Sequence, residues 1–283
     1  PYKTFCARFE KPIVQDEDAN AVRRLNQFTG PFILRRMKSE VLRELPPKTE
    51  NVRRVELETE QRKLYLAAVV DAREKLRAAK PEDKMTVFAV LMRLREICCD
   101  PRLVADNWTG SSAKLEACLE LVTEAVAGGH RILLFSQFTS MLELLAKRLD
   151  EAGVSHFTLQ GSTPKPVRAE QVRRFNQGEA DVFLISLRAG GTGLNLTAAD
   201  IVIHYDPWWN LAAQNQATDR AYRIGQRNPV QVYRLIAQDT IEEKIVELQQ
   251  AKQSLADTVT GGADGAILSM NPEQLLQLLG EEA

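Results

Sequence analysis

The sequence predicts an α/β fold in which a parallel sheet is covered by helices on both faces. Five short apolar runs recur between residues 131 and 237, and most of them are separated by segments with helical periodicity. Runs that are apolar at nearly every position are typical of parallel strands, because such strands are buried on both sides. With 283 residues, of which 44% are hydrophobic and 27% charged, the chain can also bury a full core.

The predicted elements follow one another in a simple order along the chain. Pro46-Pro47 breaks the chain, so we place a boundary there, at the end of residues 1–50. Two helical segments follow over residues 58–100, within a helical region at 51–112, and the α/β domain follows at 113–237. Its strands are expected at 131–136, 156–161, 181–186, 200–206 and 230–237. A helix from Thr240 opens the last region, 238–283.

Capping signals place two helices between these strands. Ser140 and Glu143 form a predicted capping box at the start of the first helix. Thr163-Pro164 opens the second helix, because proline is favoured in a first turn.

A third helix is predicted to begin after Asn210, its N-cap residue, to include QATDRAYRIGQ, residues 216–226, and to end at Gly225. Gln216, Arg220 and Arg223 would then lie at i, i+4 and i+7, on one side of the helix. Arginine pairs well with phosphate, which gives this stripe a possible role in phosphoryl transfer. The alternative for Arg223 is an exposed ion pair with Asp219, one turn earlier.

Charge and cysteine content exclude several classes of function. The net charge is −1, but residues 238–283 carry −7 and the preceding residues therefore carry +6, which leaves DNA binding open. The four cysteines show no C-x-x-C pair and the three histidines are scattered, so neither a metal site nor a disulfide framework is predicted. No apolar run approaches the roughly 18 residues of a membrane span.

Polar residues follow the predicted strands. In an open parallel sheet, ligands bind beyond the carboxyl ends of the strands. These positions hold Gln137 and Thr139, Gly161 with Ser162 and Thr163, the loop SLRAGGTGLN at 186–195, and Trp208-Trp209. Such donors suit contacts with a sugar-phosphate backbone. Helix capping is the alternative for the hydroxyls, and core packing is the alternative for the tryptophans.

The glycine-rich loop is not a complete nucleotide site. It has three glycines in four residues, 190–193, which would let backbone N–H groups approach a phosphate. It matches neither the P-loop nor the dinucleotide fingerprint, and no glycine in the chain is followed by lysine. A plain turn is therefore an alternative, and the main phosphate-binding loop for any nucleoside triphosphate must lie elsewhere.

Six stretches, in order, resemble the second RecA-like lobe of the Swi/Snf-type chromatin-remodelling ATPases, within the superfamily-two helicases. They are PFILRRMKSEVLRELPPKTE, LMRLREICCDPRLV, RILLFSQFTSMLELL, LQGSTPKPVRAEQVRRFN, FLISLRAGGTGLNLTAADIVIHYDPWWN and QATDRAYRIGQ. The resemblance covers about residue 31 to the C-terminus, and the last two stretches are the most specific. It implies that ATP lies between two lobes, and that the first lobe supplies the Walker lysine and the acid that holds Mg²⁺.

The resemblance also implies roles for single residues. Arg223 corresponds to the arginine finger that reaches the γ-phosphate, Arg220 to a neighbouring phosphate arginine, and Gln216 opens the same motif. Gly193 and Asn195 correspond to the nucleotide side of the glycine loop. One strand of duplex DNA would follow a larger set: Gln137, Thr139, Gly161, Ser162, Thr163, Arg168, Ser186, Arg188, Gly190, Gly191, Thr192 and Trp209. Two departures leave local loop shape open: Leu211, where many members have proline, and Pro164-Lys165-Pro166.

By the same resemblance, residues 1–50 are the end of the first lobe and a linker, and 51–112 are the helical protrusion and the entry to the second lobe. Residues 113–237 are the RecA-like C-terminal lobe, and 238–283 are a brace helix with an acidic tail. The parent enzyme implied is an ATP-hydrolysing double-stranded DNA translocase that remodels or displaces DNA-bound proteins. Its partners are the first lobe, duplex DNA and a DNA-bound protein, and this lobe alone is expected to be inactive. The absence of basic targeting runs favours the bacterial cytoplasm, near the nucleoid, over the nucleus.

Two other functions are compatible with parts of this pattern. A free-standing nucleotide-binding enzyme built around residues 186–195 would bind ATP or a dinucleotide tightly, but the first strand, RILLFS, is not followed by a fingerprint loop. A non-catalytic RecA-like interaction module would tolerate the loss of Arg220 and Arg223. The intact motif around both arginines argues against the module.

Overall fold

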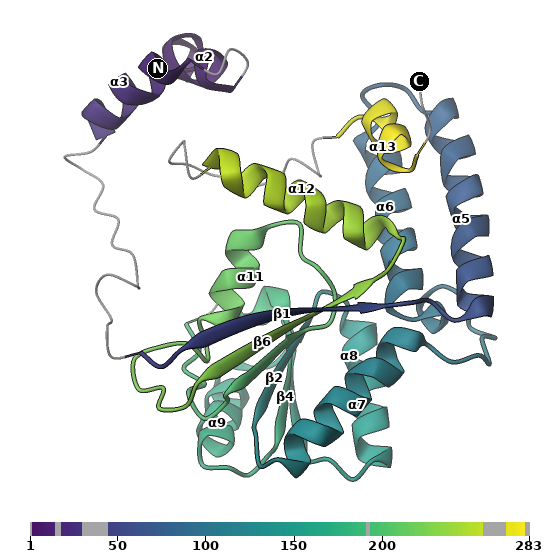
Figure 1. Cartoon of the computed structure of the whole chain (residues 1–283), viewed down its shortest axis with the longest axis vertical. Coiled ribbons are helices and arrows are strands. Elements are labelled where there is room, and N and C mark those ends of the chain that lie inside the picture. Colours follow the sequence, from purple (N-terminus) through teal and green to yellow (C-terminus); the bar gives the residue numbers. More distant parts are fainter. Residues whose placement is uncertain (1, 15–17, 30–44, 191–192, 257–269, 281–283) are drawn as a thin grey trace. The chain divides into compact units, whose positions relative to one another are not determined.

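The computed structural model describes residues 2–14, 18–29, 45–190, 193–256 and 270–280 (Figure 1). The chain divides into two compact units, one formed by residues 1–44 and 251–263 and the other by residues 45–250 and 264–283. The larger unit contains the whole sheet and all the candidate site residues.

The smaller unit contains short helical segments. They are α1 Tyr2–Phe5, the π-helical turn η1 Cys6–Glu10, α2 Lys11–Val14 and α3 Ala19–Thr29. The ring of Phe9 lies 5.7 Å from that of Phe5 and 6.3 Å from that of Phe28, so an aromatic cluster joins η1 to α1 and α3. Most of the stretch that begins PFILRR lies outside the described residues.

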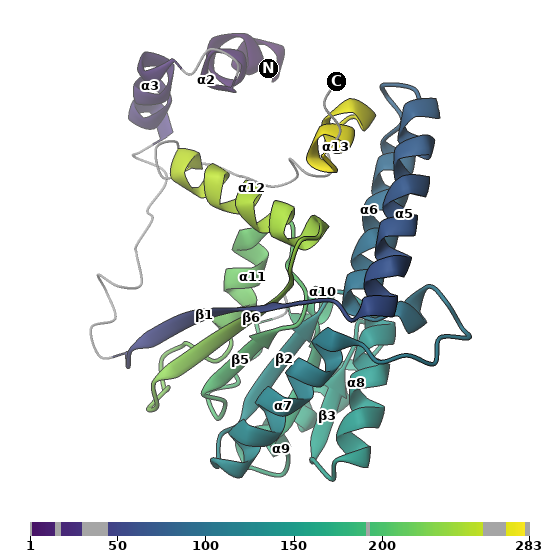
Figure 2. The same ribbon diagram turned by 45° about the vertical axis from the view of Figure 1, so that its right-hand side comes forward.

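Six parallel strands form one sheet in the larger unit (Figures 1 and 2). Across the sheet their order is β1–β6–β5–β2–β4–β3. The strands are β1 Lys48–Val55, β2 Ile132–Ser136, β3 His156–Leu159, β4 Val182–Ser186, β5 Ile201–His204 and β6 Val230–Ala237. The chain passes from β4 on one side of β2 to β5 on the other. A switch of this kind marks the usual ligand site of an open α/β sheet, at the carboxyl ends of the strands.

Helices cover both faces of the sheet, as the apolar runs predicted. One face carries α7 Ala113–Ala127 and α8 Thr139–Glu151, and the other carries α9 Lys165–Asn176, α10 Leu187–Gly190 and α11 Leu211–Thr218. Strand β2 shows the alternation clearly, because Ile132 and Leu134 belong to the first core and Leu133 and Phe135 to the second. The predicted α/β class and parallel sheet are confirmed.

A third core lies between the two long helices that follow β1 and the helices at the end of the chain. The long helices, α5 Thr59–Ala78 and α6 Lys84–Cys99, lie side by side (Figure 2). Helix α13, Pro272–Leu278, packs against both, and α12, Ile241–Ala256, begins beside them. A short 3₁₀ turn, η3 Pro101–Leu103, then leads from α6 towards α7.

The start of α12 is held by polar groups as well as by apolar packing. The backbone N–H of Ile241 donates to the Tyr65 hydroxyl at 2.7 Å. Lys114 on α7 and Glu242 on α12 form a fully buried ion pair. Burial alone lowers the pKa of Lys114, but the Glu242 carboxylate raises it above its usual value. These contacts fix the first turn of α12 to both the long helices and the sheet domain.

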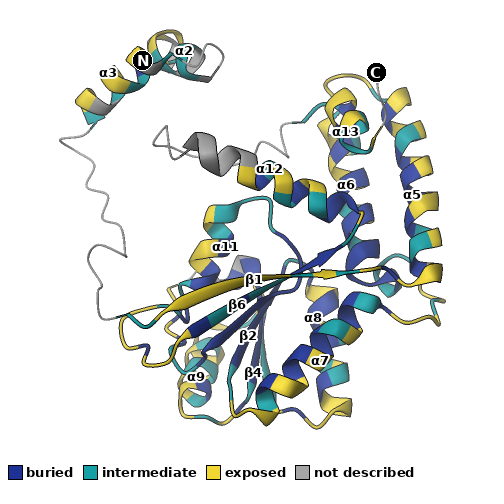
Figure 3. Cartoon of the chain, in the orientation of Figure 1, coloured by how far each residue is buried: buried dark blue, intermediate teal, exposed yellow. Residues whose placement is uncertain are grey.

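Strand β1 was not among the predicted strands. It follows Pro46-Pro47 directly and pairs with β6 from Lys48 beside Val230 to Val55 beside Ala237. Its sequence, KTENVRRV, lacks an apolar run because β1 is an edge strand with mostly exposed side chains (Figure 3). Charged residues are common on sheet edges, where they block pairing with other chains.

The start of α8 also differs from the prediction. The helix begins at Thr139, with Phe138 as its N-cap residue and no side-chain capping bond. The capping box of Ser140 with Glu143 is therefore wrong. The chain enters the helix earlier because the Phe138 N–H donates to the Ser136 hydroxyl, 3.2 Å away, directly at the end of β2.

Candidate nucleotide and DNA interface

Asp206, the second residue after β5, organises the ends of two neighbouring strands. Its buried carboxylate accepts hydrogen bonds from the Ser136 hydroxyl at 2.6 Å and from the Gln137 backbone N–H at 3.1 Å. It also pairs with Arg95 of α6, with Nη2 and Oδ2 3.0 Å apart. The polar residues predicted after β2 and β5 are thus brought together and tied to the long helix α6.

Gln137 and Thr139 lie at the end of β2, as predicted for DNA contacts. Thr139 is exposed in the first turn of α8. The Gln137 side chain is engaged with α6, because its Oε1 accepts from Arg95 at 2.5 Å and its Nε2 lies 3.4 Å from the sulfur of Met92. These two contacts hold the Gln137 side chain in a fixed position.

The loop after β3 is open to an extended ligand. Gly161 and Ser162 are exposed, and a Cβ atom at Gly161 would meet no other atom within 4 Å. Thr163 does not cap α9; its hydroxyl accepts the Gln160 N–H at 3.0 Å and closes the turn. Arg168 lies in the first turns of α9 and is half-buried.

The residues after β4 divide into buried and exposed positions. Ser186 is 3% exposed and accepts the Ala189 N–H at 3.4 Å, so it holds the start of α10. Arg188 and Gly190 lie on that short helix. Gly191 and Thr192 lie outside the described residues.

The nucleotide side of the glycine loop is exposed. Gly193 has a φ of +49°, in the left-handed region that favours glycine. Asn195 is exposed as well, and its backbone oxygen accepts the Asn176 side-chain amide of α9 at 2.8 Å. The next residue, Leu196, donates its N–H to the Arg220 oxygen at 3.0 Å. This bond places the end of the glycine loop beside the turn that follows α11.

Helix α11 begins as predicted and ends earlier than predicted. Asn210 is the N-cap residue, and its side chain accepts the Ala213 N–H at 2.9 Å. The helix ends at Thr218, whose hydroxyl lies 2.9 Å from Nε2 of the buried His204 on β5. The continuous helix to Gly225 is therefore wrong, because tertiary bonds to β5 and to the glycine loop turn the chain first.

The two arginines of the motif nevertheless lie close to each other. Arg220 is 7% exposed, and its Nε has no hydrogen-bond partner among the described residues. Burial and the charge of Arg223 lower the pKa of Arg220, and Asp219 offsets them only in part. Arg223 itself is exposed, and Gln216 is exposed on α11. Because α11 ends at Thr218, both arginines lie beyond it, and the three residues do not form the predicted stripe on one helix.

Gln226 closes this turn and was given no role by the sequence analysis. Its Nε2 donates to the backbone oxygens of Ala199 and Ala221, at 2.7 and 3.2 Å. Its Oε1 accepts the N–H groups of Arg227 and Asn228, at 2.8 and 2.9 Å. One buried amide therefore fixes the backbone on both sides of the arginines. The sequence signal for this role was the place of Gln226 as the last residue of QATDRAYRIGQ.

Trp208 and Trp209 form a tightly held loop ahead of α11. The Trp208 N–H donates to Gln214 at 3.2 Å, and its oxygen accepts the Gln249 side chain of α12. The Trp209 ring lies 4.0 Å from the Arg95 guanidinium and 6.4 Å from the Phe88 ring. Both tryptophans are partly buried and pack against the cores, and both follow β5 at the carboxyl edge of the sheet. The two alternatives, core packing and a place at this edge, therefore hold together.

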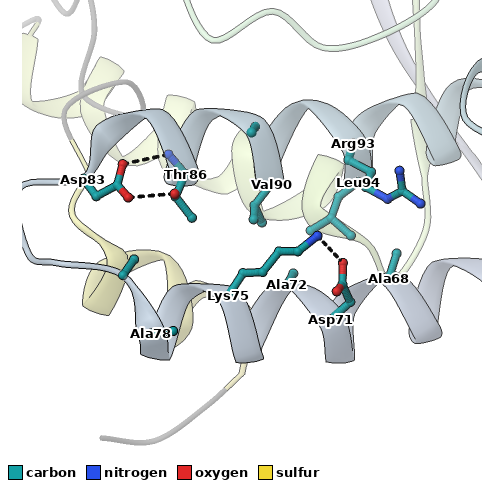
Figure 4. A pocket seen from close by; sticks show the side chains of 12 residues that line it. Ala68, Asp71, Ala72, Lys75, Ala78, Asp83, Thr86, Val90, Arg93 and Leu94 are labelled. Atoms are coloured by element: carbon teal, nitrogen blue, oxygen red, sulfur yellow. Dashed lines mark hydrogen bonds and ion pairs between the residues drawn. The ribbon is translucent and has the colours of Figure 1, made fainter.

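Metal-ligating side chains are not clustered in the part of the chain that the structure describes. These residues contain no group of three His, Cys, Asp or Glu side chains able to hold a metal ion. A hollow of about 400 Å³ lies between α5 and α6 (Figure 4), but its lining of alanines, Asp71, Lys75, Arg93 and their neighbours includes no residue predicted to bind ATP or DNA. Within the same ranges, every helix is too short or too polar to cross a bilayer.

Comparisons with known proteins agree with this geometry. The helicase conserved C-terminal domain matches residues 113–225, and the SNF2-related domain matches residues 1–103. An uncharacterized ATP-dependent helicase of Mycoplasma pneumoniae is 38% identical over 98% of this chain and 26% of its own length. The mouse SWI/SNF-related matrix-associated actin-dependent regulator of chromatin subfamily A member 1 is 37% identical over 86% of this chain and 24% of its own length. The chain thus spans about a quarter of the length of these relatives.

Solved structures show the same likeness. The Sulfolobus solfataricus SWI2/SNF2 ATPase core in complex with double-stranded DNA is 30% identical, with a TM-score of 0.71 over 100% of this chain and 61% of that one. The C-terminal domain of the same ATPase is 27% identical, with a TM-score of 0.68 over 83% of this chain and 100% of that one.

The fold and the match to the helicase conserved C-terminal domain define a RecA-like C-terminal lobe of a helicase-like ATPase. Within that class, the chain belongs to the Swi/Snf-type, SNF2-related family.

Proposed function

We propose that this chain is the second motor lobe of an ATP-dependent double-stranded DNA translocase that remodels or displaces DNA-bound proteins. The observation that carries the proposal is the pair Arg220 and Arg223. Arg220 is buried beside Arg223, and its Nε has no hydrogen-bond partner among the described residues. Such an arrangement costs free energy of folding unless an anion binds to the guanidinium. Both cations suit a triphosphate, since guanidinium groups bind phosphate through paired N–H donors.

The two arginines take different roles in this proposal. Arg223 is exposed and free to reach across to the γ-phosphate, where a positive charge stabilises the transferred group. The backbone oxygen of Arg220 accepts the Leu196 N–H, which fixes the position of this residue. Its side chain binds a neighbouring phosphate oxygen. Gly193 and Asn195 line the same side, and Gln216 contacts the nucleotide or the opposite lobe from α11.

The first lobe supplies the Walker lysine and the acid that holds Mg²⁺ in this proposal. The arginine pair fits a triphosphate bound there, and its exposed member suits a site shared by two lobes. ATP with Mg²⁺ supplies the reactive phosphoryl group, and this chain contributes charge and position. We therefore expect the isolated chain to hydrolyse almost no ATP and to bind DNA weakly.

Residues at the ends of β2, β3 and β4 form the proposed DNA track. The exposed members, Thr139, Gly161 and Ser162, offer hydroxyl and backbone N–H groups that suit phosphate contact without base reading. Arg168, the residues of α10 with Gly191 and Thr192, and the ring of Trp209 extend the proposed track. Ser186 acts indirectly, because it is buried and holds α10.

Each cycle closes and reopens the two lobes. Closure brings Arg223 to the phosphate and shifts the grip of this lobe along one DNA strand, so the protein moves along the duplex without separating it. We place α5 and α6 in the protrusion and α12 in the brace of this motor. Bacterial relatives favour a location at the nucleoid, and the remodelled target is a DNA-bound protein.

Displacement of a third strand from a duplex tests translocation without strand separation. The two-lobe protein, with this chain joined to its first lobe, is mixed with ATP and a duplex that carries a triplex-forming strand at one end. We expect ATP-dependent release of the third strand with the duplex left intact. Separation of the duplex would contradict the translocase, and the absence of both DNA-stimulated hydrolysis and release would favour a non-catalytic interaction module.

A further inference from the structure

One buried side chain, Arg95 on α6, joins the separate segments at the carboxyl edge. It is 0% exposed. Its Nη1 donates to Gln137 Oε1 at 2.5 Å, and its Nη2 donates to Asp206 Oδ2 at 3.0 Å and to the Pro207 oxygen. A buried guanidinium is stable only with such partners, so the segments after β2 and β5 hold positions that Arg95 defines.

The same guanidinium lies over two aromatic rings. Its central carbon lies 4.0 Å from the centre of the Trp209 ring and 5.4 Å from that of Phe138. Arginine stacks on aromatic rings and presents several N–H donors in one plane, whereas lysine is a compact point charge. The arrangement therefore requires arginine rather than a positive charge alone.

A continuous chain of contacts leads from this arginine to the phosphate arginines. Trp209 is followed by Asn210, the N-cap residue of α11. The other end of α11 is fixed at Thr218, by its bond to His204, two residues before Arg220. The eight-residue helix α11 therefore joins Trp209 at its start to the arginine turn beyond its end.

The Gln137 amide provides the link to DNA. Its Oε1 accepts from Arg95, while the partner of its Nε2 among the described residues is the thioether sulfur of Met92. Thioether sulfur is a weak acceptor, so a DNA phosphate can replace it. Phosphate, amide and guanidinium then form one polarised row of hydrogen bonds, in which a phosphate strengthens the bond to Arg95.

We propose that Arg95 is a positioning residue that couples DNA contact at Gln137 to the placement of Trp209, α11 and the phosphate arginines. The inference rests on the proposed translocase function. It adds a role for a residue that touches neither DNA nor nucleotide. The sequence signal was an arginine at i+4 from Leu91, on the apolar side of the second helical segment.

The test is Arg95→Lys in the two-lobe protein, with ATP turnover measured with and without saturating duplex DNA. Couplings of this kind amount to roughly 5- to 150-fold. We expect the DNA stimulation to fall by a factor in that range, through turnover at saturating ATP rather than through the KM for ATP. Arg93→Lys, an exposed position on the same helix, is the matched control and should keep the wild-type stimulation.

A double-variant cycle separates coupling from general damage to the fold. If Gln137 acts through Arg95, then Arg95→Lys combined with Gln137→Ala reduces stimulation no more than the more severe single change. Additive losses, or normal stimulation in Arg95→Lys, would overturn the inference while leaving the translocase intact. If Arg95→Lys does not fold, Arg95→Gln with Asp206→Asn removes both buried charges and must show the same loss. A wild-type protein without DNA stimulation would instead refute the proposed function itself.

Discussion

The pH dependence of stability should depend strongly on His204. Its ring is 1% exposed, stacks on Phe135 at 5.6 Å and 22°, and has an Nδ1 without a hydrogen-bond partner among the described residues. Burial, with the nearby charges of Arg234 and Lys48, lowers the pKa of His204 from 6.5 to about 3. The folded protein therefore holds this imidazole neutral throughout the range in which most histidines become charged.

The magnitude follows from the two pKa values. Between about pH 3 and pH 6.5 the unfolded chain binds a proton at His204 that the folded chain does not, so stability falls as the pH falls. The slope is about 1.4 kcal/mol per pH unit, and the loss between about pH 7.5 and pH 5 is about 2 kcal/mol from this group. Urea unfolding of the chain, followed by tryptophan fluorescence at several pH values, measures this free energy.

Two variants isolate the contribution of the ring. His204→Phe keeps a flat side chain and should remove about 2 kcal/mol of the acid-dependent loss. Thr218→Val removes the hydrogen bond between the Thr218 hydroxyl and Nε2 of His204 but keeps the titrating ring. It should therefore cost about 1 kcal/mol at every pH and leave the pH dependence unchanged. Equal pH dependence in the wild type and in His204→Phe would refute the reasoning.

Two further changes test the contacts that hold the site. Lys114→Met leaves the Glu242 carboxylate buried and unpaired, so unfolding in urea should show a loss of about 3–5 kcal/mol, most of it regained on adding Glu242→Gln. A full loss in the double variant would contradict this account. Gln226→Ala should cost about 1–3 kcal/mol in the same assay, because the arginine turn loses the four hydrogen bonds of this side chain. The ATP turnover of the two-lobe protein should fall for the same reason. Unchanged turnover would show that the turn keeps its shape without Gln226.

The sheet could be predicted from sequence because burial on both faces leaves a plain signal. Strand β2 is buried at every position, and its letters ILLFS are apolar except for a serine that bonds to Asp206. Strand β1 gave no such signal, since an edge strand is defined by backbone pairing with β6 and its side chains are free to be charged.

The places of the candidate site residues in the fold were predictable from the sequence, but their local geometry was not. The glycine loop follows β4 as expected, and α11 has the predicted Asn210 cap. The early end of α11 depends on bonds to His204 and Leu196, which are far from it in sequence. Arg95 and Gln226 act through partners on other elements in the same way, so periodicity within one segment could not reveal their roles.

In the proposed function, this lobe gives an arginine to ATP that is bound by another lobe. The most direct test is the turnover of ATP by the two-lobe protein with saturating duplex DNA, for the wild type, Arg223→Ala and Arg227→Ala, the last being an exposed neighbour outside the arginine pair. We predict a fall of roughly 10³-fold or more for Arg223→Ala, the scale of arginine fingers, and wild-type turnover for Arg227→Ala. DNA-stimulated turnover that survives in Arg223→Ala would contradict the account.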